Sequence, residues 1–298
     1  MLHLFGEEDN LTTITSLAYP FLDRSVPLTA RSVKDAYREF LRTVQPKVPV
    51  ETGGIHYIRD RERAADYLAA FRTDSMLTDT RYQFETADSA SRAAVEEARQ
   101  AVGRIEAGAC SLAARDTSFG NVYPLAMNAV FHAPSKVATG GTTSGALGVL
   151  WVDPRETWQE RDIQEFLYHE LGHTLLFLDE RRFGLFTSYP QMVDRKNWVT
   201  SAIRGTVRPL DKAFHSAVVA TEVLLAREET LGHPMSAVLH PLSPQLASGA
   251  LTSARDIERS PARQLLTKHA AGILRRSRDQ VERLAARHGW SLDSRDLA

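Results

Sequence analysis

The stretch "YHELGHTLLFLDE", residues 168–180, contains two histidines four positions apart, with a glutamate directly after the first. Its apolar residues repeat at helical spacing, which predicts a helix. On that helix His169 and His173 lie one turn apart on the same face, where two imidazoles can bind a single metal ion. Glu170, about 100° round the helix, can reach a metal-bound water without being a ligand itself. The stretch is therefore predicted to form part of a catalytic metal site.

The neighbouring sequence supplies a start and an end for this helix. Asp153 can cap the N-terminus, Pro154 suits the first position, and Glu156 adds an acidic group to the first turn. Gly184 is expected to end the helix. The segment before it, "GALGVLWVD", has the composition of a strand. A strand followed by an HExxH helix is the arrangement found in zincin-type enzymes.

The pattern of the sequence changes twice along the chain. Residues 1–115 read mainly as helices, residues 116–185 as a small sheet and the HExxH helix, and residues 186–298 as helices that include a third metal ligand. No repeat or low-complexity linker marks a boundary, so residues 1–298 are predicted to form a single catalytic domain. The predicted fold class is α+β, mainly α: a zincin-like strand followed by the HExxH helix, surrounded by a helical bundle.

Individual elements can be placed within these regions. Helices are predicted over residues 29–44, 61–71 and 88–114, the last opening on Asp88 or Ser89. Strands are predicted in "NVYPLAMNAVFHA" and "GALGVLWVD", and the glycine-rich "TGGTTSG" between them is predicted to be a turn or loop. A C-terminal helical run over residues 253–288 is expected to break near Pro261.

Composition excludes several classes of protein. The 298 residues include 36 basic and 37 acidic side chains, and this net charge of -1 gives no overall attraction to nucleic acid or anionic membranes. No signal-peptide pattern and no window of eighteen apolar residues is present, so neither secretion nor membrane insertion is expected. The one cysteine, Cys110, rules out an intrachain disulfide and is expected to be buried in a helix. The chain is predicted to be cytoplasmic.

A catalytic metal site needs a third protein ligand and an open position. Short-spacer zinc peptidases place that ligand ten residues after the first histidine, here Asp179, and need a glycine where this chain has Leu176. On an unbroken helix Asp179 lies about 9 Å along the axis from His173 and about 120° round it, too far to share an ion. Glu180 shares the histidine face but lies about 10.5 Å further along. The short-spacer class is therefore not expected.

A second predicted helix, over residues 208–228, offers better candidates. His215 and Glu222 lie seven positions apart on one face of this helix, about 10.5 Å apart along its axis. Both cannot easily bind one ion, so one is expected to be the ligand and the other to orient a histidine or bind substrate. The alternative without function is a satisfied core histidine and a buried salt bridge.

The segments "FLYHELGHTLLFLDERR" and "RPLDKAFHSAVVATEVL" together resemble the HExxH-motif peptide-modification proteins of bacterial natural-product clusters. The resemblance covers about a quarter of the chain, and the middle of the motif, Leu171 and Gly172, departs from the commoner form. Some members of that family are regarded as iron- and 2-oxoglutarate-dependent β-hydroxylases. The resemblance implies that His169, His173 and His215 bind the metal.

Under this resemblance the cofactors are Fe(II) and 2-oxoglutarate, and an arginine should hold the far carboxylate of the cosubstrate. Arg208 and Arg204 are the nearest candidates. Glu170 and Glu222 are the predicted catalytic carboxylates, and the substrate is expected to be a peptide, an amino acid or a carrier-bound amino acid. Two alternatives stay open: a zinc metallopeptidase with Glu170 as general base, and a non-catalytic protein with a degenerate metal site.

Overall fold

The computed structural model describes residues 1–72, 92–136 and 138–292, and within these ranges the chain is mainly helical with a small mixed sheet. The helices of the first half are α1 Leu2–Phe5, α2 Glu7–Ala18, α3 Ala30–Val44, α4 Arg61–Arg72, α5 Arg92–Arg115 and α6 Thr117–Ala126. Those of the second half are α7 Glu160–Phe183, α8 Tyr189–Met192, α9 Leu210–Ala226, α10 Ser243–Arg259 and α11 Lys268–His288. This confirms the predicted class, α+β and mainly α.

The sheet has the strand order β1-β2-β4-β3, formed by β1 His56–Ile58, β2 Ala129–His132, β4 Ala146–Val152 and β3 Gly140–Thr143. The pairs β1·β2 and β2·β4 are parallel, and β3 runs antiparallel to β4. Every residue of β2 and β4 is buried, as expected for parallel strands covered on both faces. A separate antiparallel ribbon pairs β5 Val199–Thr200 with β6 Val207–Arg208.

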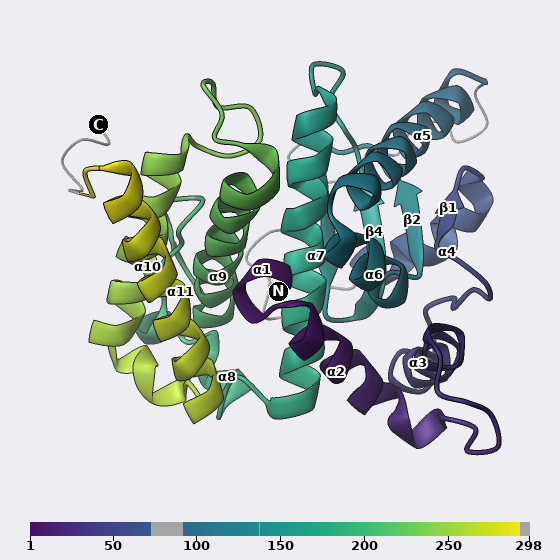
Figure 1. Cartoon of the computed structure of the whole chain (residues 1–298), viewed down its shortest axis with the longest axis horizontal. Coiled ribbons are helices and arrows are strands. Elements are labelled where there is room, and N and C mark those ends of the chain that lie inside the picture. The colour runs from purple at the N-terminus through teal and green to yellow at the C-terminus, as the bar shows by residue number, and fades with distance from the viewer. Residues whose placement is uncertain (73–91, 137, 293–298) are drawn as a thin grey trace.

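Helix α7 lies at the centre of the molecule (Figure 1). The sheet and α5 pack against it on one side, and α9, followed by α10 and α11, lies on the other. The N-terminal helices α1 and α2 contact both α7 and its neighbours. One cluster of buried apolar side chains includes residues from all three regions of the sequence, from Met1 to Leu284. The HExxH motif is thereby fixed on a helix that is supported on several sides.

Several predicted elements match the structure. Thr29 caps α3, whose N-terminal turn forms a capping box with Ser32. Gly184, with a φ of 69°, follows the last residue of α7. The expected break near Pro261 is a 3-10 turn, Pro261–Leu265, between α10 and α11. The cap predicted for the long helix, Asp88 or Ser89, lies outside the described residues.

Other elements differ from the prediction. The first six residues of "NVYPLAMNAVFHA" belong to α6, because Asp116 caps that helix by accepting a hydrogen bond from the Phe119 amide at 3.1 Å. The segment "TGGTTSG" contains β3, which pairs with β4. Helix α7 begins at Glu160 rather than near Pro154, since Asp153 instead accepts hydrogen bonds from the Ser135 amide and Arg155.

The prediction that the Cys110 side chain is buried is wrong. Cys110 on α5 is exposed, not buried, because the packed face of that helix is set by Val102, Ile105, Ala109 and Leu112 and the thiol lies off that face. No helix among the described residues combines the length and apolar character needed to cross a membrane.

Gly148 in β4 illustrates how tightly the sheet packs on α6. Its φ is 72°, and a Cβ added there would lie 2.7 Å from the Ala126 carbonyl oxygen. Gly148→Ala is therefore expected to lower the free energy of unfolding by about 1–3 kcal/mol, through overpacking and a left-handed backbone. The matched control is Gly103→Ala on α5, where an added Cβ meets open space and is expected to stabilise the helix by about 0.5–1 kcal/mol. Urea unfolding of both variants measures the difference, and equal effects would contradict this account of the sheet.

Candidate metal centre

A cavity of about 710 Å³ lies over the HExxH face of α7. Its walls include His169, Glu170 and His173 from α7, His215 from α9, and the residues of β3. His240, from the loop before α10, also lines it. Two helices that are far apart in the sequence thus bring imidazoles to one cavity.

His215 is the imidazole of α9 that lies beside the motif histidines in the cavity. Its Nδ1 lies 3.2 Å from Nδ1 of His173, and the two rings are stacked with centroids 5.5 Å apart. The ring of His169 is 4.8 Å from that of His173. His173 therefore lies next to both His169 and His215. The ligand atoms of the three imidazoles do not all lie within 4.8 Å of one another, as those of a metal-ready group among the described residues do. Binding one ion therefore requires rotation of these side chains, which line a cavity of about 710 Å³.

The protonation of these histidines suits metal binding. Burial lowers the pKa of His215 to about 3. Burial and the neighbouring His169 and His215 hold the pKa of His173 well below its ordinary value, and burial with His240 does the same for His169. All three rings are therefore neutral near pH 7, and each keeps the nitrogen lone pair that a metal ligand needs.

A chain of buried polar groups supports His169 from behind. Arg227 donates two hydrogen bonds to Glu165, at 2.7 and 2.8 Å. The same carboxylate accepts from Nδ1 of His240 at 2.8 Å, and Nε2 of His240 lies 2.9 Å from Nδ1 of His169. Burial raises the pKa of Glu165, but hydrogen bonds from His240 and Arg227 outweigh it and hold the pKa at about 2. The carboxylate is therefore charged at neutral pH.

This chain fixes the tautomer of His169. Because Glu165 can only accept, His240 donates from Nδ1 and accepts at Nε2. His169 then donates from Nδ1, which leaves the lone pair on its Nε2 facing Glu170, whose Oε1 is 3.8 Å away. Metal-binding histidines usually donate their other ring N–H to a carboxylate, a backbone carbonyl or water, and here His240, backed by Glu165, takes that place.

Glu170 lies between the histidines and the sheet. Its Oε2 accepts a hydrogen bond from the Thr142 hydroxyl of β3 at 3.0 Å. Burial raises the pKa of Glu170 to about 7, despite the opposing effect of the Thr142 hydrogen bonds. The group can therefore both accept and release a proton near neutral pH.

The two predicted arginines, Arg204 and Arg208, line the cavity, together with Lys212 and Arg181. Arg208 and Lys212 are close enough to contribute to the lowered pKa of His173. These cationic groups make part of the cavity wall suited to an anionic ligand, although Glu180 and Asp211 on the same wall offset some of that charge.

The structure does not bring Glu222 into the cavity. Its carboxylate accepts hydrogen bonds from the backbone amides of His3 at 2.8 Å and Leu4 at 3.1 Å, so it anchors α1 to α9. Glu222 and His215 do lie on the same face of α9. They are two turns apart, however, and Glu222 lies under α1 instead of beside the metal ligands. Asp179 is likewise away from the motif and bonds to His269 at 2.7 Å.

Sequence reasoning missed His240, Glu165 and Arg227. His240 lies in a loop with no regular spacing to HExxH, and no pattern pointed to it. Glu165 carried a weak signal, since it is one turn before His169 on the same helix.

Comparison of the chain with protein-family models and with curated proteins finds no match. The resemblance to the HExxH peptide-modification proteins therefore stays a prediction.

Proposed function

We propose that the chain is a metal-dependent enzyme, a non-heme iron and 2-oxoglutarate oxygenase that hydroxylates a peptide, an amino acid or a carrier-bound amino acid in specialised metabolism. The observation that carries this proposal is the approach of His215 to His173, Nδ1 to Nδ1 at 3.2 Å, in a cavity that His169 also lines. Three neutral imidazoles suit Fe(II) and Zn(II) alike, and they leave coordination positions for other ligands.

The residues of the cavity fit the iron hypothesis. When bound, Fe(II) would activate dioxygen to hydroxylate a C–H bond, and oxidative decarboxylation of 2-oxoglutarate to succinate and CO₂ would supply the other two electrons that dioxygen takes up. His169, His173 and His215 would hold the ion, and the chain from Glu165 through His240 orients His169. Arg208 and Arg204 line the same cavity and can bind the far carboxylate of the cosubstrate through paired hydrogen bonds.

The position of β3 supports a peptide substrate. In the described sheet β3 is an end strand, and its residues Gly140, Gly141, Thr142 and Thr143 line the cavity. An edge strand offers unpaired backbone groups to which an extended peptide can add as a further strand. A peptide bound in this way runs past Glu170, which Thr142 holds in place.

Turnover measurements test the proposal directly. Protein purified without oxygen is expected to bind about one Fe(II) at this site and to convert 2-oxoglutarate to succinate with candidate peptides, in an oxygen-dependent reaction. Peptide cleavage with zinc and without oxygen would overturn the proposal in favour of a metallopeptidase. A third outcome, no metal at the HExxH site and no loss of stability with a chelator, would indicate a non-catalytic protein.

The zinc metallopeptidase is kept as a second candidate because Glu170 is placed as a general base would be. It lies beside Nε2 of His169, and its pKa of about 7, raised by burial, suits proton transfer.

Glu170→Gln separates the two candidates. In a peptidase the substitution removes the general base and is expected to lower kcat by about 10²–10⁴-fold while metal stays bound. In an oxygenase the glutamate is not needed to activate water, so we expect 2-oxoglutarate turnover to fall by about tenfold, the low end of the cost of losing a group that supports a metal site. Metal content and both activities are measured on the same preparation. A loss of oxygenase turnover as large as that of a base would contradict the assignment of Glu170 to a supporting role.

A further inference from the structure

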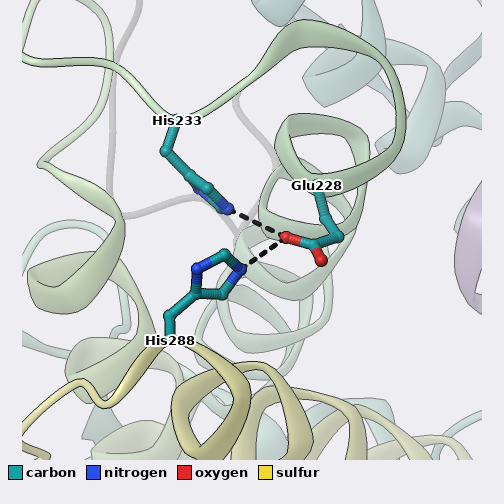
Figure 2. A group of neighbouring side chains, drawn as sticks. All are labelled: Glu228, His233 and His288. Atoms are coloured by element: carbon teal, nitrogen blue, oxygen red, sulfur yellow. Dashed lines mark hydrogen bonds and ion pairs between the residues drawn. The ribbon is translucent and has the colours of Figure 1, made fainter.

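A second group of metal-ligating side chains lies away from the HExxH cavity. Glu228 is in the π-helical turn Arg227–Leu231 that continues α9, His233 follows that turn, and His288 is the last residue of α11. Their ligand atoms all lie within 4.8 Å of one another. Figure 2 shows both imidazoles pointing at the Glu228 carboxylate, whose Oε2 is 3.0 Å from Nε2 of His233 and 2.7 Å from Nε2 of His288.

This geometry is close to that of a metal site. In a tetrahedral zinc site with metal–ligand distances of about 2.0 Å, neighbouring ligand atoms are about 3.3 Å apart. The two distances from the Glu228 oxygen are shorter by a few tenths of an ångström, so the three side chains need to separate only slightly to admit an ion. All three are partly exposed, with 18–31% of each side chain accessible, so an ion can reach them from solvent.

Two of the three ligands have a hydrogen-bonding neighbour that can orient them. Nδ1 of His233 is 2.8 Å from the Ser243 hydroxyl, and Arg287 donates to the other oxygen of Glu228, Oε1, at 2.6 Å. In this structure Nε2 of His233 donates to Glu228 and Nδ1 accepts from Ser243. An ion would displace the Nε2 proton, and the other tautomer, which donates from Nδ1 to Ser243, would turn its Nε2 lone pair to the metal. Hydrogen bonds from Arg287, His233 and His288 lower the pKa of Glu228 to about 2, so the carboxylate is charged at neutral pH.

We propose that Glu228, His233 and His288 bind a divalent transition metal, zinc by preference, and that the ion forms a clasp between α11 and the end of α9. Two imidazoles and one carboxylate are a donor set that zinc accepts, and the fourth position faces solvent. An ion here joins two elements that are about sixty residues apart in the chain. Ser243, which contacts His233, also accepts a hydrogen bond from Arg227 at 3.1 Å. The clasp is thereby connected to the buried hydrogen bonds from Arg227 through Glu165 and His240 to His169. The site does not depend on the oxygenase assignment.

Zinc titration of a His169→Ala/His173→Ala variant tests the clasp separately from the HExxH centre. The full-length variant is expected to bind one Zn²⁺ per chain. Adding His233→Gln or His288→Gln is expected to weaken that binding by more than tenfold, since even a partner behind a ligand contributes about 10–100-fold. The matched control is His269→Gln, the same substitution on α11 but outside the cluster, which should leave zinc affinity unchanged.

Trp290 gives a second readout that works in the wild-type chain. Its ring stacks on His288 with centroids 4.9 Å apart, and it meets His233 edge-on at 5.1 Å. Ni²⁺ bound at the cluster should therefore quench Trp290 fluorescence, and both Trp290→Phe and His288→Gln should remove that component. Absence of bound zinc in the double variant, together with quenching that His288→Gln does not change, would overturn the proposal and leave an ion-pair network only.

Discussion

Replacing His215 with alanine is expected to lower affinity for the ion of the HExxH site by more than about 100-fold and to abolish turnover. The reason is that His215 supplies the third imidazole of the cavity, and even loss of a group behind a ligand costs about 10–100-fold in affinity. Metal content and competition titration with a chelator measure the loss. Thermal unfolding without metal checks that the variant is folded, and His269→Gln serves as a histidine substitution outside the site.

Glu222→Gln provides the contrast that makes the His215 result specific. Spacing alone left Glu222 open as an alternative third ligand, although the resemblance favoured His215; in the structure the Glu222 carboxylate accepts from the amides of His3 and Leu4. Its substitution is expected to weaken the attachment of α1 and lower stability by about 1–3 kcal/mol, with metal affinity changed less than tenfold. Loss of metal from the Glu222 variant with retention in the His215 variant would reverse the assignment.

Glu165→Gln is expected to cost about 3–5 kcal/mol of stability, the largest stability effect predicted for this chain. The substitution leaves the charge of Arg227 buried without its partner, because Glu165 accepts two of its hydrogen bonds and both side chains are almost fully buried. It also removes the acceptor of His240, so metal affinity at His169 should fall by about 10–100-fold. The control is Glu282→Gln, the same change in an exposed ion pair with Arg255, which should cost less than about 1 kcal/mol.

The pH dependence of stability gives an independent check on Glu165. Its pKa in the folded chain is held at about 2 by His240 and Arg227 against the effect of burial, below the ordinary 4.5. A carboxylate with a lowered pKa stabilises the fold above its unfolded pKa, and the contribution is lost as pH falls from about 4.5 toward 2. The difference in unfolding free energy between wild type and Glu165→Gln should therefore be constant near neutral pH and shrink below about 4.5. A constant difference down to pH 3 would show that the carboxylate is not the source.

Features with a local periodic signal could be predicted from the sequence. Helix α7 places His169 and His173 on the cavity wall, and α9 brings His215 to the same cavity, as their spacing indicated. The helical period shows which residues lie on the same face of a helix. It does not show which part of that face another helix covers. That is why it could not distinguish His215, in the cavity, from Glu222, which lies under α1.

Features that depend on tertiary structure could not be predicted. Strand β3 has a loop-like composition. Glycine is required at position 140 because a Cβ there would lie 2.3 Å from the Phe166 ring. The first residues of the expected strand at 121 became helix because Asp116 caps α6. His240 reaches His169 only because the loop before α10 folds back over α7, a contact 71 residues apart in the chain.

Crystals of the metal-bound protein, with diffraction measured at the iron and zinc absorption edges, test the central claim most directly. The account predicts an anomalous peak in the HExxH cavity, about 2.0–2.2 Å from a nitrogen of each of His169, His173 and His215. A peak bound by the two motif histidines and a residue other than His215, or no peak in this cavity, would contradict it.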